Sequence, residues 1–176
     1  MKLIEKYACR KLRKKAAAVN RRVELPNPDS VRKVCVLWQP SQKEAFQYLH
    51  DHFLREQVIF RNLCVYPSNA VADAGTNIIT QKDLNWMGLP KNGPADDFIK
   101  IEYDLLLNIA LEQTLVLNYL TALSRARFKV GWSPDDANFF DLNINIGMKQ
   151  DALYLAKQQI FYLGQLNKKL YDESSI

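Results

Sequence analysis

Apolar residues gather along the chain in short runs that have the length and composition of strands. Four such runs span residues 31–38, 58–66, 103–110 and 127–132. The run at 103–110 is the most continuous, which is typical of a strand covered on both faces in a parallel sheet. Residues 140–146 instead alternate apolar and polar side chains, the pattern of a half-exposed strand near a sheet edge.

Between these runs the apolar residues recur with helical spacing. This spacing predicts helices at about 41–57, 113–125 and 148–170. We expect Ser41 to cap the first of them while Glu44 reaches back, as in a capping box. The segment from Thr80 to Asp83 predicts a single helical turn, and we expect loops at 67–80 and 91–97, the first ending in the short apolar piece Ile78-Ile79.

Strands and helices therefore alternate, with short connections between them. This order is typical of a mostly parallel sheet with helices on both faces. We predict an α/β fold, a single three-layer Rossmann-like domain at residues 31–176 with about five strands and a long C-terminal helix. Residues 1–24 are expected to form a basic amphipathic helix, which the two prolines of residues 25–30 join to the domain as a linker.

The N-terminal helix has a narrow apolar stripe, in part alanine, made by Ile4, Ala8, Leu12 and Ala16. Short isolated helices are marginal in water, so an ordered helix here must pack against apolar surface. We expect it to pack on the C-terminal helix and to leave most of its cations in solvent. The predicted docking residues are Leu3, Ile4, Tyr7 and Leu12.

Charge divides the chain at the same place. Residues 1–24 hold nine of the 24 basic residues and two of the 19 acidic ones, so the body of the protein is slightly acidic. This asymmetry predicts a negatively charged partner for the helix. The candidate polyanion-binding residues are Lys6, Arg10, Lys11, Arg13, Lys14, Lys15, Arg21 and Arg22. The alternatives are a solvated or self-docked helix and attachment to a membrane surface.

Composition excludes several classes of protein. No apolar run approaches the roughly 20 residues that span a bilayer, and the basic residues at 11–15 interrupt any signal peptide. Cys9, Cys35 and Cys64 are widely spaced, as in a reduced, cytoplasmic protein. We expect Cys35 and Cys64 to be buried as small apolar residues.

No nucleotide-binding fingerprint follows the first strand. The sequence there is WQPSQK, whereas the dinucleotide signature needs glycines that let the backbone approach a pyrophosphate. Ligands of open α/β sheets bind at the carboxyl ends of the strands, and this rule nominates a crevice at Gln39, Ser41, Asn108 and Glu112. The alternative interpretation makes Ser41 a helix cap and Asn108 a hydrogen-bonded strand-end amide.

The remaining polar residues do not form a pattern for catalysis. His50 and His52 are two positions apart on a predicted helix and so point away from each other. The pairs Asp96-Asp97 and Asp135-Asp136 have the residue type for Mg²⁺ binding, but acids exposed to solvent in loops are the commoner explanation. We predict no catalytic residue, no metal site and no cofactor.

Two resemblances rest on the stretch from Tyr103 to Trp132. The strand Tyr103–Asn108 and the segment Ser124–Gly131, with the basic helix at 2–22, resemble a family of uncharacterised bacterial proteins, a domain of unknown function without an assigned activity. The same stretch is distantly similar to the acceptor-side domain of heptosyltransferase-type glycosyltransferases, which implies kinship of fold. In those enzymes a Gly-Asp pair stands where this chain has Trp38 to Ser41.

Two functions follow as hypotheses. The first is a non-catalytic binding or interaction module whose basic helix contacts a polyanion such as RNA, or an acidic partner protein, through residues 2–22. The alternative is a protein that binds a nucleotide or sugar in the strand-end crevice, or a vestigial glycosyltransferase-like domain. No pattern in the sequence specifies an oligomeric state.

Overall fold

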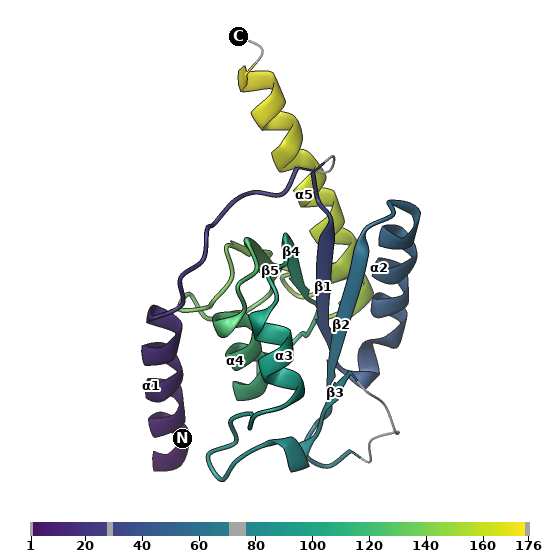
Figure 1. The fold of residues 1–176 in the computed structure, drawn as a ribbon. Coiled ribbons are helices and arrows are strands. Elements are labelled where there is room, and N and C mark those ends of the chain that lie inside the picture. The colour runs from purple at the N-terminus through teal and green to yellow at the C-terminus, as the bar shows by residue number, and fades with distance from the viewer. Residues whose placement is uncertain (1, 28–29, 71–76, 175–176) are drawn as a thin grey trace.

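The sheet of the protein is open and parallel, with the layout predicted from the sequence. The computed structural model describes residues 2–27, 30–70 and 77–174, with side chains described through Lys168. Six parallel strands occur in the order β3-β2-β1-β4-β5-β6 (Figure 1). They are β1 (Lys33–Trp38), β2 (Ile59–Val65), β3 (Ile78–Ile79), β4 (Leu105–Asn108), β5 (Phe128–Gly131) and β6 (Leu142–Asn143).

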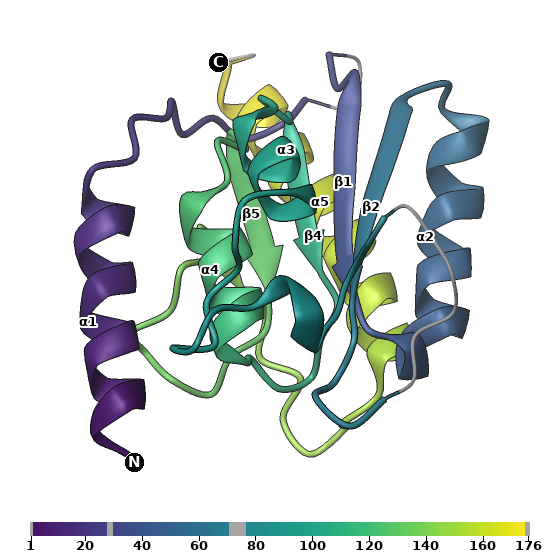
Figure 2. The same cartoon turned by 60° about the horizontal axis from the view of Figure 1, so that its bottom comes forward.

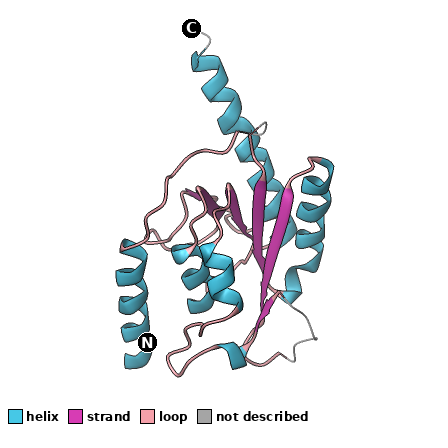
Figure 3. Cartoon of the chain, in the orientation of Figure 1, coloured by secondary structure: helices cyan, strands magenta, loops and turns pink. Residues whose placement is uncertain are grey.

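Helices cover both faces of this sheet, which confirms the three-layer architecture (Figure 3). On one face, strand residues such as Val36 and Leu107 pack against α2 (Lys43–Arg55) and α5 (Ala152–Ser174). On the other face, Leu37 and Leu106 pack against α3 (Pro94–Lys100) and α4 (Leu115–Leu123). Cys35 and Cys64 are buried, as expected.

The N-terminal helix α1 (Leu3–Ala17) lies outside α4, on the side away from the sheet (Figure 2). Its buried residues are Ala8 and Leu12, which pack with Met87, Leu89 and residues of α4. The predicted contact with the C-terminal helix was therefore wrong, because α5 covers the opposite face of the sheet. Leu3, Ile4 and Tyr7, three of the four predicted docking residues, are exposed.

The ends of α1 and α5 also differ from the prediction. Helix α1 ends at Ala17, before residue 24, and the chain then follows the body, where Glu24 N donates to Arg127 O at 3.0 Å. Of the predicted linker, residues 28–29 lie outside the described residues. Helix α5 begins at Ala152 because Asp151 Oδ1 accepts a hydrogen bond from Tyr154 N at 2.9 Å.

Two local predictions were wrong for identifiable reasons. Residues 94–97 were expected in a loop, but Pro94 occupies the first turn of α3 and Gly93 precedes it with φ 140°. Proline is favoured at a first helical position, where its missing N–H costs nothing. Ser41 does not cap α2, because Pro40–Gln42 form a 3₁₀ turn in which Gln42 Oε1 accepts a hydrogen bond from Gln39 N at 3.0 Å.

The helical turn predicted at Thr80–Asp83 is confirmed as a 3₁₀ turn at Gln81–Asp83, where Thr80 N donates to Asp83 Oδ2 at 2.8 Å. The alternating segment 140–146 contributes only Leu142–Asn143 to the sheet, as the edge strand β6. Ile144 and Ile146 nevertheless stay buried, so the alternation identified the face they occupy correctly.

Candidate ligand crevice at the carboxyl edge of the sheet

The order of the strands creates a switch point between β1 and β4. The chain leaves β1 toward α2 on one face of the sheet and leaves β4 toward α4 on the other face. Connections that diverge in this way leave a crevice at the carboxyl ends of the two strands, where open α/β proteins bind ligands. The strand-end rule used on the sequence points to this same edge.

A crevice of about 750 Å³ lies at this edge. Its walls come from the end of β2 and the following residues, from the loop around Met87, from the first turn of α4, and from the segment after β5. Helix α1 supplies a further wall. Among the polar residues in contact with the crevice are Arg13, Gln39, Tyr66, Gln113, Asn118 and Asp135.

A buried amide network fixes the centre of the crevice. Asn108, at the end of β4, is 0% exposed and donates through Nδ2 to Gln113 Oε1 at 2.9 Å and to Thr121 Oγ1 at 3.2 Å. Gln113 Nε2 lies 3.1 Å from the carbonyl oxygen of Trp132, to which it donates, just beyond β5. The network thus ties β4, β5 and α4 together and holds the Gln113 side chain at the crevice.

The first turn of α4 and the side chain of Arg13 bring positive charge to one part of the crevice. Thr114 caps the helix, and its Oγ1 accepts a hydrogen bond from Leu117 N at 3.3 Å. A helix cannot satisfy its first N–H groups internally, so the amides of Leu115 and Val116, which line the crevice, remain available to an acceptor. Glu5 and Asp135 bring negative charge to the same crevice.

The four predicted crevice residues have different positions. Gln39 lines the crevice, whereas Asn108 lies buried beneath it and positions Gln113. Ser41 and Glu112 are exposed and are not among the described residues that line it. The sequence analysis missed Gln113 and Asn118, although Thr114 three residues before Leu117 is an N-cap signal that would have located the start of α4.

The cations of α1 lie on its exposed sides, because the helix docks through alanine and leucine. The exposed cations of the helix are Lys6, Arg10, Lys11, Arg13, Lys14 and Lys15, and Lys2 at its N-cap is also exposed. Two other predicted polyanion-binding residues follow the helix. Arg21 makes a bidentate ion pair with Asp141, with Nη2 to Oδ1 at 2.6 Å, and Arg22 lies 3.4 Å from Glu24. Arg21 is therefore engaged within the body.

Beside Arg21 the structure buries a lysine that the sequence analysis did not single out. Lys129 in β5 is 2% exposed, and its Nζ donates to Ala122 O, near the C-terminal end of α4, at 3.2 Å. Burial and the Arg21 guanidinium lower the pKa of Lys129 to about 7, although Asp141 and Cys35 oppose the shift. Burial also raises the pKa of the Cys35 thiol.

The histidines stay apart from the crevice. His50 Nδ1 lies 3.4 Å from Asp51, and His52 Nε2 lies 3.3 Å from Glu56. Within the described ranges, no group of three or more His, Cys, Asp or Glu side chains is placed to hold a metal ion. None of the helices in those ranges is long and apolar enough to cross a membrane.

The strand order and the switch-point crevice define an open α/β protein of Rossmann-like layout. The chain belongs to a family of unknown function, DUF6913, whose model matches residues 1–166. This confirms the first resemblance drawn from the sequence. No curated protein and no solved structure matches the chain, so the resemblance to heptosyltransferase-type enzymes stays a prediction.

Proposed function

We propose that this protein binds a small phosphorylated molecule, of the nucleotide or sugar-phosphate class, in the carboxyl-edge crevice. The observation that carries the proposal is the position of the crevice, a space of about 750 Å³ at the β1/β4 switch point. Its volume lies within the roughly 300–1,000 Å³ of ligand pockets. This position supports the alternative hypothesis from the sequence, ligand binding in the strand-end crevice, over the first hypothesis of a module that acts through its basic helix.

The lining suggests how such a ligand would be held. A phosphate accepts hydrogen bonds from the amides that open α4 and pairs with the guanidinium of Arg13. Gln39, Gln113 and Asn118 offer donors and acceptors for hydroxyl groups. Asp135 is a carboxylate able to accept from a ribose or sugar hydroxyl. The protein acts here as a binding module, without a proposed catalytic residue.

Arg13 and Arg10 provide a matched test. Both are exposed cations of α1, but only Arg13 contacts the crevice. Isothermal titration calorimetry with a panel of nucleotides, sugar nucleotides and sugar phosphates should find a ligand, and the same ligand at 100 times its Kd should add about 2.7 kcal/mol of stability. Arg13→Glu should weaken its binding at least about tenfold, and Arg10→Glu less than about twofold. A panel without a ligand, or equal losses in both variants, would contradict the proposal.

A second candidate function is supported by the six exposed cations of α1. Docking through Ala8 and Leu12 presents these cations on a helix held by the body, which suits a polyanion such as RNA. If about six of them meet phosphates of single-stranded RNA, log K should fall against log salt with a slope of about −4. Fluorescence anisotropy at several salt concentrations measures this slope. RNA binding through α1 would be excluded if the affinity did not depend on salt. It would also be excluded if the triple variant Lys6→Glu, Arg10→Glu, Lys14→Glu bound RNA as tightly as the parent protein.

A further inference from the structure

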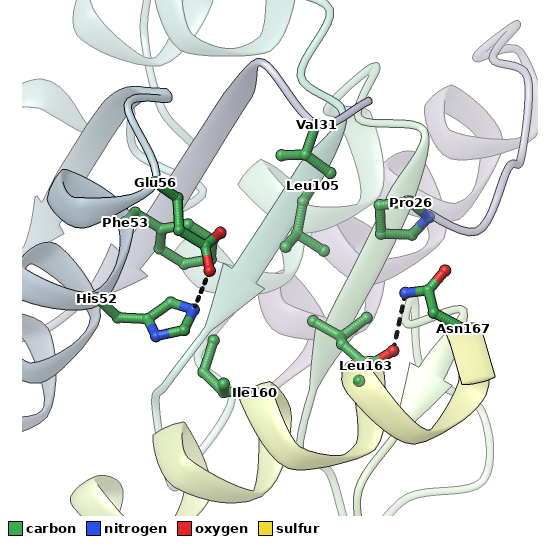
Figure 4. A pocket seen from close by; sticks show the side chains of 10 residues that line it. Pro26, Val31, His52, Phe53, Glu56, Leu105, Ile160, Leu163 and Asn167 are labelled. Carbon is green, nitrogen blue, oxygen red and sulfur yellow. Dashed lines mark hydrogen bonds and ion pairs between the residues drawn. The ribbon is translucent and has the colours of Figure 1, made fainter. Parts of the chain in front are cut away.

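A second pocket lies at the opposite end of the sheet, where the strands begin. It has a volume of about 190 Å³ and is bounded by α2, by α5, and by Pro26 and Val31 ahead of β1 (Figure 4). Its apolar lining consists of Pro26, Val31, Phe53, Leu105, Ile160 and Leu163. We call it the amino-edge pocket.

The walls of this pocket belong to the main hydrophobic core. Val31, Phe53, Leu105 and Leu163 are all buried and are part of the cluster between the sheet and helices α2 and α5. Side chains of a packed core keep fixed positions, so the pocket is preformed. A water molecule in this pocket would find few partners for hydrogen bonds. In another protein, an engineered apolar cavity of about 150 Å³ stays dry and binds benzene. The amino-edge pocket is large enough for one aromatic ring with a small substituent.

Gly164 adds no side chain to the wall that α5 gives the pocket. It lies inside the 23-residue helix α5 and lines the pocket. Its φ is not positive, and a Cβ atom added to it would meet no neighbouring atom within 4 Å. Glycine in a helix interior costs about 1 kcal/mol relative to alanine. Neither packing nor backbone conformation requires glycine here, so its effect is the open space beside the pocket.

Polar groups stand at two sides of the opening (Figure 4). On one side His52 Nε2 lies 3.3 Å from Glu56 Oε1, and both side chains are partly exposed. On the other side Asn167 donates through Nδ2 to Leu163 O at 2.8 Å. The ring of His52 meets that of Phe53 edge to face, with centroids 4.9 Å apart. A bound ring would thus find an aromatic wall next to a hydrogen-bonding group.

We propose that the amino-edge pocket binds a small aromatic molecule that carries one hydrogen-bonding substituent, of the phenol or indole class. The ring occupies the space between Phe53, Leu105 and Leu163, and the substituent reaches the polar edge at His52. The volume fits one ring, and three walls enclose it, which suits a small molecule better than a helix or strand of a partner protein. This site is independent of the carboxyl-edge crevice.

Gly164 allows a direct test with a matched control. Leucine at this position should fill the pocket, whereas alanine adds one methyl group and leaves most of the space. With 4-fluorophenol and indole as probes, ¹⁹F NMR of the first and calorimetry of the second should detect binding to the full chain. Gly164→Leu should weaken binding at least about tenfold, and Gly164→Ala less than about threefold. Far-UV circular dichroism verifies that both variants keep the fold.

Other outcomes are equally decisive. Absence of binding of both probes at millimolar concentration would overturn the proposal, as would unchanged binding by Gly164→Leu, which would locate the probes elsewhere. A second variant, Leu105→Phe, fills the pocket from the sheet side and should also weaken binding. Arg13→Glu, at the other edge, should leave probe binding unchanged. Loss of probe binding in Arg13→Glu would place the probes in the crevice and refute the site.

Discussion

The two edges of the parallel sheet differ in size, polarity and charge. The carboxyl edge holds a crevice of about 750 Å³ with many polar side chains, and the amino edge holds a pocket of about 190 Å³ with an apolar floor. The crevice is lined by residues of α1 and α4 and by residues that follow the strands, whereas the pocket is lined by residues of α2, β4 and α5. The difference follows from chain direction, because α4 begins at the carboxyl edge and α2 ends at the amino edge.

Helix direction makes the two edges electrostatically unequal. Helix N-termini carry partial positive charge and unsatisfied N–H groups, whereas C-termini carry partial negative charge and unsatisfied carbonyls. At the carboxyl edge the amides that open α4 and the guanidinium of Arg13 therefore offer partners to an anion, alongside the carboxylates of Glu5 and Asp135. The amino edge offers an anion nothing comparable, which leaves burial of apolar surface as its main source of affinity. We accordingly propose ligands of opposite character for the two edges.

The largest expected effect on stability concerns Asn108, whose buried side chain supports the crevice at the carboxyl edge. Asn108→Ala removes the buried amide that bonds Gln113, Thr121 and the backbone N–H of Ala110. Leaving these groups without partners should cost about 3 kcal/mol of the free energy of unfolding. Urea denaturation measures the loss, and binding in the crevice should weaken with it. The exposed Asn145→Ala should cost under about 1 kcal/mol, and an equal cost in the two variants would contradict the role of the network.

The next effect depends on pH and concerns Lys129. Its pKa is lowered to about 7 in the folded protein from 10.5, so between these values the unfolded chain binds more protons. Stability should therefore rise as the pH increases above about 7. Above pH 9 the raised pKa values of Cys35 and Cys64 act in the opposite direction. Lys129→Met should raise stability at pH 6 by about 2 kcal/mol, because burial opposes the charge.

Urea denaturation of both proteins at pH 6, 7, 8 and 9 measures this difference. The gap between variant and parent should narrow as the pH rises, while contributions of the cysteines cancel in the comparison. A gap of constant size would show that the charge of Lys129 does not matter and that the effect reflects packing or the lost hydrogen bond to Ala122.

A change in stability of similar size is expected for α1, which forms one wall of the crevice. Leu12 is buried against α4 and Leu3 is 84% exposed, although the sequence predicted that both would dock. Leu12→Ala should lower stability by about 2 kcal/mol, at the low end for a buried leucine, and Leu3→Ala by under about 0.5 kcal/mol. Thermal unfolding separates them. If neither variant changes the midpoint, the docking of α1 contributes nothing to stability and the crevice lacks a firm wall.

Local patterns predicted the fold better than they predicted the site. The continuous run at 103–110 and the alternation at 140–146 each report on burial along one segment, so strand identity and the buried face could be predicted. The crevice depends on which segments meet. The apolar stripe of α1 contains Ala8, but whether the flanking Tyr7 also faces the protein depends on the surface of α4. Lys129 likewise has an ordinary sequence context, and only the packing of α4 over β5 buries it.

The smallest expected change in stability concerns Gly164 at the amino edge. Gly164→Ala should raise the free energy of unfolding by about 0.5–1 kcal/mol, because alanine favours the helix and its Cβ meets no other atom. This gain would show that the parent protein forgoes helix stability at the amino-edge pocket. Urea denaturation at one pH is sufficient, with Lys157→Ala on the exposed side of α5 as a control for helix propensity alone. A loss of stability in Gly164→Ala would mean that the backbone at this position needs glycine, and the open pocket would then be a by-product of the helix.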